Sequence, residues 1–270
     1  MDLVKRIQKV ELGNLAKVIS LCDDLSLNYF LIGGSLLGAI RHHGFIPWDD
    51  DMDIGLTRND YETFAKFAPA KLRNDHYFLQ TAYSDENYGL SYMKLLDRHT
   101  YIEEKANVNN ARKGVFIDIF PFDQIPNDAS LRRSQITRYK VLDSRIILKA
   151  RYGLIETPFR RLRPDITPDK MDDLTDMKRQ REAIMKEYDQ GSFMNYKNLA
   201  SQYAYDREIL SASEINHLMQ VPFESLTVNV PTDYDTILTR MYGDYMTLPP
   251  ENQRTEKHIN RLIMDNQIFE

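Results

Sequence analysis

Hydrophobic positions recur at helical spacing through the first 25 residues and at strand-like spacing directly afterwards. Apolar residues from Leu3 to Leu21 return every three or four positions, which predicts an opening helix over residues 2–26. A short apolar run at residues 29–32 ends at a Gly-Gly-Ser sequence and predicts a buried strand. Ser35 is a favourable N-cap for a second helix, and Gly44 is a plausible stop for it.

The following hundred residues alternate between extended and helical patterns. Pro47 disfavours helix and introduces an extended run at residues 51–56. Thr57 or Asn59 is expected to cap a helix over residues 61–67, which Pro69 closes. Further strands are predicted at residues 77–80, 90–96, 101–103 and 114–121, the last of them ending at its proline.

The pattern changes after Pro126. Basic amphipathic helices are predicted at residues 129–150 and 169–188, joined by a proline-bearing stretch at 157–168. A late strand at 225–230 precedes a helix over 237–241, capped by Thr232 or Asp233. We therefore expect an α+β fold with two parts. A mixed sheet with flanking helices forms a catalytic core over residues 1–126, and a mostly helical substrate or acceptor lobe over residues 127–270 packs on it.

Composition narrows the class of protein. The 270 residues carry a formal net charge of −5, which argues against a general nucleic-acid-binding surface. The single cysteine, Cys22, excludes an intramolecular disulfide and fits a reducing compartment. The N-terminus does not resemble a signal peptide, and the longest mostly apolar run, 29–40, is far shorter than the ~20 residues of a membrane span. We expect a cytoplasmic protein, with peripheral contact at the inner membrane face left open.

Three aspartates and the glycine turn carry the candidate chemistry. Asp51 and Asp53 point to the same side of an extended strand, and Asp49 is in phase with them. Two such carboxylates repel each other, and Mg²⁺, with Mn²⁺ as the alternative, relieves that repulsion. Asp118 lies within an apolar run, where burying an acid is costly without a cation or hydrogen-bonding partner. A Gly-Gly-Ser turn before a helix can hold phosphate, so the set indicates a nucleotide-handling phosphotransferase.

The segment around these residues resembles a known family. It reads Leu-Leu-Gly-Ala-Ile-Arg-His-His-Gly-Phe-Ile-Pro-Trp-Asp-Asp-Asp-Met-Asp-Ile-Gly over residues 36–55. With the preceding Gly-Gly-Ser and the later Asp118, it is similar to the nucleotidyltransferase-fold LicD family of phosphotransferases, which includes teichoic acid phosphocholine transferases. Matching segments at residues 92–97, 114–121 and 242–250 extend the resemblance over most of the chain.

The resemblance implies transfer of phosphocholine from CDP-choline to a sugar hydroxyl of a teichoic acid precursor, expected to be lipid-linked, with CMP leaving. On that reading Gly34 and Ser35 hold the donor phosphates. Asp51 and Asp53 bind the metal, and Asp118 completes the site and can take the proton of the acceptor hydroxyl.

Other positions have a structural interpretation beside the functional one. Arg41, His42 and Lys94 are candidates to neutralise phosphate charge, yet the first two can cap a helix end and the third can be a solvated strand residue. Trp48 is a candidate for holding the choline ammonium, since aromatic faces attract cations, and equally a packing residue. Basic side chains at residues 132–151 and 160–163 can form a solvated face or meet an anionic acceptor at a membrane.

The resemblance also leaves other functions open. A sibling enzyme of this kind transfers ribitol phosphate or another sugar phosphate. A non-catalytic scaffold would keep the fold, although idle buried carboxylates argue against it. A nucleotide-adding nucleotidyltransferase fits the Pro-Trp-Asp-Asp-Asp sequence poorly.

Overall fold

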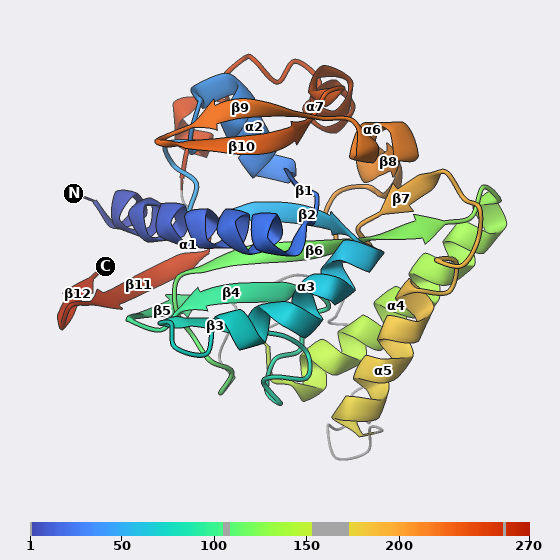
Figure 1. Ribbon diagram of the computed structural model, residues 1–270, viewed down its shortest axis with the longest axis horizontal. Helices are drawn as coiled ribbons and strands as arrows, with labels where there is room; N and C mark the ends of the chain where they lie inside the picture. Colours follow the sequence, from blue (N-terminus) through green and yellow to red (C-terminus); the bar gives the residue numbers. More distant parts are fainter. Residues whose placement is uncertain (1, 105–108, 153–172, 256–257) are drawn as a thin grey trace.

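A computed structural model describes residues 2–104, 109–152, 173–255 and 258–270 (Figure 1). Within these ranges the helices are α1 Leu3–Leu25, α2 Gly33–His42, α3 Arg58–Lys71, α4 Ala129–Lys149, α5 Leu174–Met185, α6 Ala212–Asn216 and α7 Tyr234–Tyr242. The strands are β1 Tyr29–Leu31, β2 Asp53–Thr57, β3 Tyr77–Gln80, β4 Met93–Asp97, β5 Thr100–Glu104, β6 Phe116–Ile125, β7 Asn195–Lys197, β8 Ile209–Ser211, β9 Leu218–Phe223, β10 Leu226–Pro231, β11 Ile259–Met264 and β12 Gln267–Phe269.

The central sheet has the order β1-β2-β6-β4-β3, and β7 and β8 continue it from the far end of β6. β2 and β6 are parallel, whereas β1 with β2, β4 with β6 and β3 with β4 are antiparallel. The expected α+β class with a mixed sheet and flanking helices is therefore confirmed.

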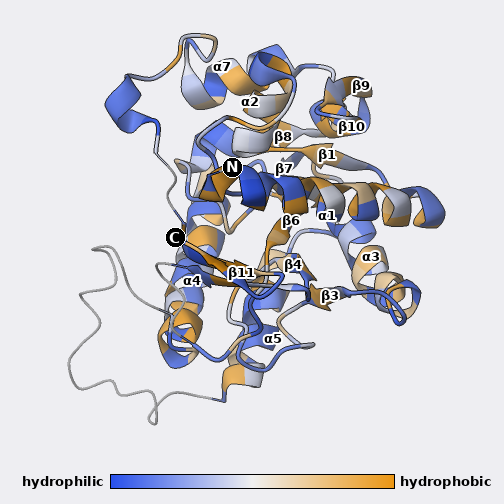
Figure 2. Cartoon of the chain, turned by 90° about the vertical axis from the view of Figure 1, so that its left-hand side faces the viewer, coloured by the Kyte–Doolittle hydropathy of each residue, from blue (hydrophilic) through white to orange (hydrophobic). Residues whose placement is uncertain are grey.

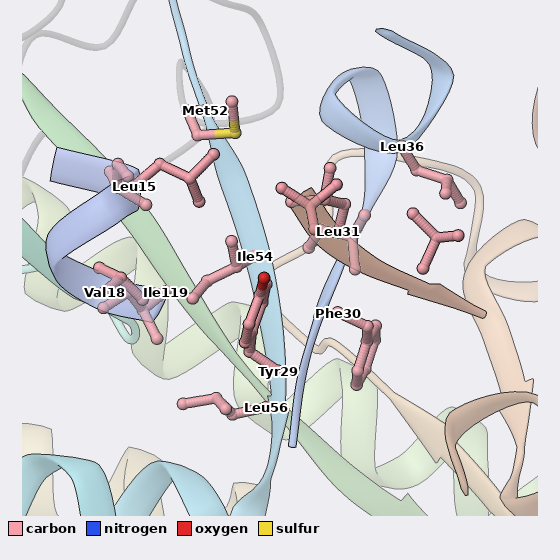
Figure 3. Close-up of a cluster of buried hydrophobic side chains, with 14 of the residues drawn as sticks. Leu15, Val18, Tyr29, Phe30, Leu31, Leu36, Met52, Ile54, Leu56 and Ile119 are labelled. Carbon is pink, nitrogen blue, oxygen red and sulfur yellow. The ribbon is translucent and has the colours of Figure 1, made fainter. Parts of the chain in front are cut away.

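One face of this sheet forms the main hydrophobic core. Ile54 of β2 and Ile119 of β6 lie against Leu15 and Val18 of α1, all of them fully buried (Figure 3). Helix α1 carries alternating polar and apolar positions along its length (Figure 2), as expected for an amphipathic helix with one side on a sheet. On the opposite face of the same strands, Phe30 and Phe122 extend this core, and Asp53 and Asp118 lie at the start of β2 and within β6.

Segments that follow residue 126 surround the sheet. The hairpin β9–β10 and helix α7 pack around α2 at the top of Figure 1, and α4 and α5 form an antiparallel pair at the opposite side. Strand β11 pairs with β5, so the C-terminal segment lies beside the first half of the chain. Residues after 126 thus contribute strands as well as helices, and the division at 126 stays a prediction. The predicted stretch 157–168 and the basic residues 160–163 lie outside the described residues.

Several predicted boundaries were wrong for identifiable reasons. α2 begins at Gly33, and its Ser35 is not the N-cap, because the Ser35 hydroxyl accepts a hydrogen bond from the backbone of Asp53 instead. The left-handed C-cap is His43 rather than Gly44. Pro69 does not close α3, which runs to Lys71; Ala68 in its last turn and Leu72 directly after it are buried in the core.

Pro121 lies inside β6 and does not end it. Pairing of β6 with β4 extends only to Ile119, and pairing with β7 starts at Asp123. Pro121 therefore falls between these two ladders, where its missing N–H costs no hydrogen bond on that side. The strands β7, β8, β9, β11 and β12 were not predicted.

Candidate active site

Two of the predicted carboxylates come from neighbouring parallel strands. Asp53, the first residue of β2, is in register with Asp118 of β6, so both side chains project from the same face of the sheet. Asp51 lies two residues before the strand, in a loop held to β6 by a 2.9 Å hydrogen bond from the Asp118 N–H to the Met52 carbonyl. The sheet therefore brings together residues that are 65 positions apart.

The glycine turn lies against these carboxylates. Gly33 has φ of +53°, a left-handed conformation that favours glycine, and it opens α2. Ser35 Oγ accepts a 2.8 Å hydrogen bond from the Asp53 N–H, which ties the turn to β2. A Cβ at Gly34 would lie 2.9 Å from Asp49 Oδ2, and one at Gly33 would lie 3.6 Å from Asp53 Oδ2. The helix N-terminus and the carboxylates thus share one space.

That space is a cavity of about 830 Å³. Its walls come from the turn, the acidic loop, two later segments at residues 198–208 and 242–255, and His258. Five predicted site residues line it: Gly34, Arg41, Trp48, Asp51 and Asp53. Among the residues described, the four other predicted ones are not part of the lining: Ser35, His42, Lys94 and Asp118. The volume is ample for a nucleotide diphosphate together with part of an acceptor.

The carboxylates of the site are crowded and poorly hydrated. Burial, followed by repulsion from Asp51 and Asp118, raises the pKa of Asp53 well above its ordinary value. Burial likewise raises the pKa of Asp118 to about 7, against the favourable influence of Lys94. The pKa of Asp49 rises to about 8, first through burial and then through repulsion by Asp51. Asp118 Oδ1 has no hydrogen-bond partner. A hard-oxygen set with excess negative charge and an unpartnered buried oxygen fits a divalent cation.

Lys94 lies behind the carboxylates. Its ammonium is 3.7 Å from Asp118 Oδ1 and 3.3 Å from Glu104 Oε1, and it sits 3.2 Å from the centre of the Phe116 ring. Only 5% of Lys94 is exposed. This position balances the charge of Asp118 directly, and a phosphate role for Lys94 stays a prediction.

Arg41 reaches the cavity from the last turn of α2. Its guanidinium donates to the Tyr245 carbonyl at 2.7 Å and to His42 Nε2 at 3.0 Å. Burial lowers the pKa of His42, which favours the neutral ring that accepts this bond. The Arg41 guanidinium is thereby directed at the wall formed by residues 242–255, and the hydrogen bond to His42 helps to fix its orientation.

Trp48 has a cation near its ring already. The Arg254 guanidinium lies 5.4 Å from the centre of the indole, and the His42 ring meets Trp48 edge-on at 6.1 Å. The indole nevertheless forms part of the cavity wall. A role for Trp48 in holding the choline ammonium stays a prediction.

Later segments bring further residues to the site, and the sequence could not assign them. Asp50 points away from the cavity and binds the C-terminal segment: its carboxylate accepts from the backbone N–H groups of His258 and Ile259 and lies 2.8 Å from His258 Nδ1. Tyr203 and Tyr242 line the cavity with their hydroxyls hydrogen-bonded to each other. No local pattern distinguishes Tyr203, Tyr242 and His258, all of which follow the motif at a long distance in the chain.

A glycine turn at a helix N-terminus, next to carboxylates on two neighbouring strands of a mixed sheet, defines a phosphotransferase of the nucleotidyltransferase type. Residues 26–159 match the LicD/FKTN/FKRP nucleotidyltransferase domain. The chain belongs to the LicD family of phosphotransferases, as the similarity beyond this domain also supports.

Two relatives are informative. The lipopolysaccharide cholinephosphotransferase LicD of Haemophilus influenzae is 28% identical over 261 residues, which cover 89% of this chain and 90% of that protein. The ribitol 5-phosphate transferase FKRP of human and mouse is 46% identical over 43 residues, 16% of this chain and 9% of that protein. In the described part of the chain, no helix combines the length and apolar character needed to cross a membrane.

Proposed function

We propose that this protein transfers phosphocholine from CDP-choline to a sugar hydroxyl of a cell-surface glycan precursor, in a metal-dependent reaction that releases CMP. The observation that carries the proposal is the register of Asp53 with Asp118 beside the Gly33-Gly34 turn. The similarity to a cholinephosphotransferase over most of the chain supports phosphocholine as the transferred group. We retain a lipid-linked teichoic acid precursor as the acceptor, with lipopolysaccharide as the alternative that the relative's name supports.

In this proposal the chain's own residues divide the work between donor and acceptor. The N-terminus of α2, with Gly34 and Ser35, holds the donor phosphates by its free N–H groups and helix dipole. Asp51, Asp53 and Asp118 would hold Mg²⁺ or Mn²⁺. When bound, such an ion neutralises charge on the transferring phosphoryl group and the leaving CMP. In this proposal Asp118 also takes the proton of the acceptor hydroxyl.

The remaining cavity residues serve recognition. Arg41 is placed to neutralise a phosphate, with His42 fixing its orientation. Trp48 would hold the quaternary ammonium, which takes the position that Arg254 approaches in this structure. Exposed basic residues of α4, such as Arg133 and Arg145, would attract a membrane-borne anionic acceptor, and salt-sensitive association with anionic vesicles tests that part separately.

Transfer of ribitol phosphate is the second candidate, favoured by the short but strong similarity to ribitol 5-phosphate transferase. A donor panel separates the two. The protein is incubated with Mg²⁺ and CDP-choline, CDP-ribitol or CTP, with and without a glycan acceptor, while CMP and pyrophosphate are measured. We expect CMP from CDP-choline. Faster CMP release from CDP-ribitol would indicate that ribitol phosphate is the transferred group. Pyrophosphate release from CTP would indicate nucleotidyl transfer. No release from any donor would support a scaffold.

A further inference from the structure

A second group of metal-ligating side chains lies at the opposite end of β4 from Lys94. His76 precedes β3, Asp97 ends β4, and His99 follows in the turn to β5. One ligand atom from each lies within 4.8 Å of the others. We propose that His76, Asp97 and His99 form a binding site for Zn²⁺ or a similar transition-metal ion. None of the three lines the cavity of the candidate active site, and the proposal does not depend on the function proposed above.

His76 is held with one ring nitrogen available. Its Nδ1 lies 3.1 Å from Asp75 Oδ1, and Asp75 is fixed in turn by Lys17 at 2.7 Å. Asp75 Oδ1 accepts a 2.8 Å hydrogen bond from the His76 backbone N–H, which keeps this carboxylate beside the ring. Nδ1 is close enough to the carboxylate to donate to it once Nε2 binds a metal, and a carboxylate is a usual second partner of a metal-bound histidine.

The free nitrogen faces Asp97 at a distance that suits a shared ion. His76 Nε2 is 3.7 Å from Asp97 Oδ2, which is longer than a hydrogen bond. Two ligands at about 2.0–2.1 Å from a tetrahedral zinc ion lie about 3.4 Å apart. The other oxygen, Asp97 Oδ1, accepts from the backbone N–H of His99 at 2.7 Å, so Oδ2 remains for the metal.

Hydrogen bonds to backbone carbonyls hold the turn after β4 against the residues before β3 without a metal. The Arg98 N–H donates to the His76 carbonyl at 2.9 Å, and the Arg98 guanidinium donates to the carbonyls of both Asp75 and His76. The charges of Lys17 and Arg98 offset those of Asp75 and Asp97, so the site has little net charge. It therefore attracts a hard cation such as Mg²⁺ only weakly. Two imidazoles and one carboxylate are ligands that favour zinc over magnesium.

His99 must move slightly to complete the site. Its ring stacks on that of His76, with centres 4.6 Å apart and planes 8° from parallel. A metal lies in the plane of each imidazole that binds it, so the rings have to tilt before both nitrogens reach one ion. His99 is exposed, which leaves its ring free to turn. Metal binding therefore has a distinctive signature, the loss of this stack.

Titration of the tag-free chain with Zn²⁺ in excess Mg²⁺, followed by calorimetry, tests the proposal. The Mg²⁺ occupies hard-oxygen sites, so a single tight Zn²⁺ site is expected. His76→Ala and His99→Ala should abolish it, and Asp75→Asn should weaken it by about 10–100-fold through the lost second partner. His217→Ala, at another exposed histidine, is the matched control and should leave the affinity unchanged.

Imidazole nitrogen NMR of the unmutated protein adds a readout that does not depend on variants folding. We expect Zn²⁺ to shift His76 Nε2 and one nitrogen of His99, while His76 Nδ1 stays protonated. Zn²⁺ binding that survives both alanine substitutions, a spectrum in which neither histidine shifts, or no tight binding at all would each overturn the proposal. CMP release plays no part in this test, so its outcome is separate from that of the proposed transferase reaction.

Discussion

Two buried aspartates of β6 should respond in opposite ways to replacement by asparagine. Asp118 has Lys94 at 3.7 Å and no hydrogen-bond partner for Oδ1. Asp123, five residues later on the same strand, accepts two hydrogen bonds from the Arg58 guanidinium at 2.6 and 3.0 Å. The first aspartate belongs to the carboxylate cluster that we propose binds a cation, whereas the second is already paired with the Arg58 guanidinium.

The pKa of Asp118 gives the size of its effect on the free energy of unfolding. It rises from 3.8 to about 7, and each unit corresponds to about 1.36 kcal/mol, so ionised Asp118 opposes folding by up to roughly 4 kcal/mol. Because the folded-state pKa is the higher one, this cost is absent below about pH 4, grows as the pH rises, and is complete above about pH 7. Asp118→Asn removes the cost but also takes a partner from Lys94. We expect the metal-free variant to gain about 1–3 kcal/mol near pH 8 and much less near pH 4.5.

Asp123→Asn provides the matched control. It leaves the buried Arg58 guanidinium without its close carboxylate partner, since Asp189 is 4.0 Å away, and we expect a loss of about 3–5 kcal/mol. Urea unfolding of both variants in EDTA at the two pH values measures the difference. If Asp118→Asn destabilises the metal-free protein near pH 8 as much as Asp123→Asn does, the carboxylate cluster is not under electrostatic strain and the reasoning is wrong.

Three further changes test other contacts. Gly34→Ala places a methyl group 2.9 Å from Asp49 Oδ2, and steady-state kinetics should show a donor KM raised by about tenfold through loss of phosphate contacts, with stability little changed. Gly55→Ala drives a methyl group to 2.6 and 2.8 Å from two phenylalanine rings, which should cost about 1–3 kcal/mol in urea unfolding; an unchanged midpoint would contradict the packing. Asp50→Asn weakens the bonds to His258 and should lower stability by about 2–3 kcal/mol, with faster proteolysis of the C-terminal segment as a second readout.

Local features of the sequence were enough to locate the centre of the candidate site. The alternation at residues 51–56 placed Asp53 on the open face, and the apolar run around Asp118 predicted a neighbouring buried strand. Their register could not be predicted, because strand pairing depends on residues that are far apart in the chain. Ser35 shows a related limit: its type and position suggested an N-cap, but a tertiary hydrogen bond to Asp53 takes its hydroxyl.

The missing parts of the site come from segments with weak local patterns. His258 precedes a short strand whose place depends on pairing with β5 and on the buried carboxylate of Asp50. Tyr203 reaches the cavity from a loop, where neither helical nor strand periodicity exists to mark its orientation. Because the chain has many tyrosines and most aromatic residues serve packing, the sequence does not show which tyrosines line the cavity.

The rate of CMP release from CDP-choline tests the central claim most directly. It is measured with Mg²⁺ and acceptor for the unmutated protein and for Asp51→Asn and Asp53→Asn, with circular dichroism to confirm that each variant is folded. We predict release by the unmutated protein that EDTA abolishes, and a loss of at least ~10²-fold in each variant, as expected when charge stabilisation of the transition state is removed. Near-normal release by both folded variants would contradict the account.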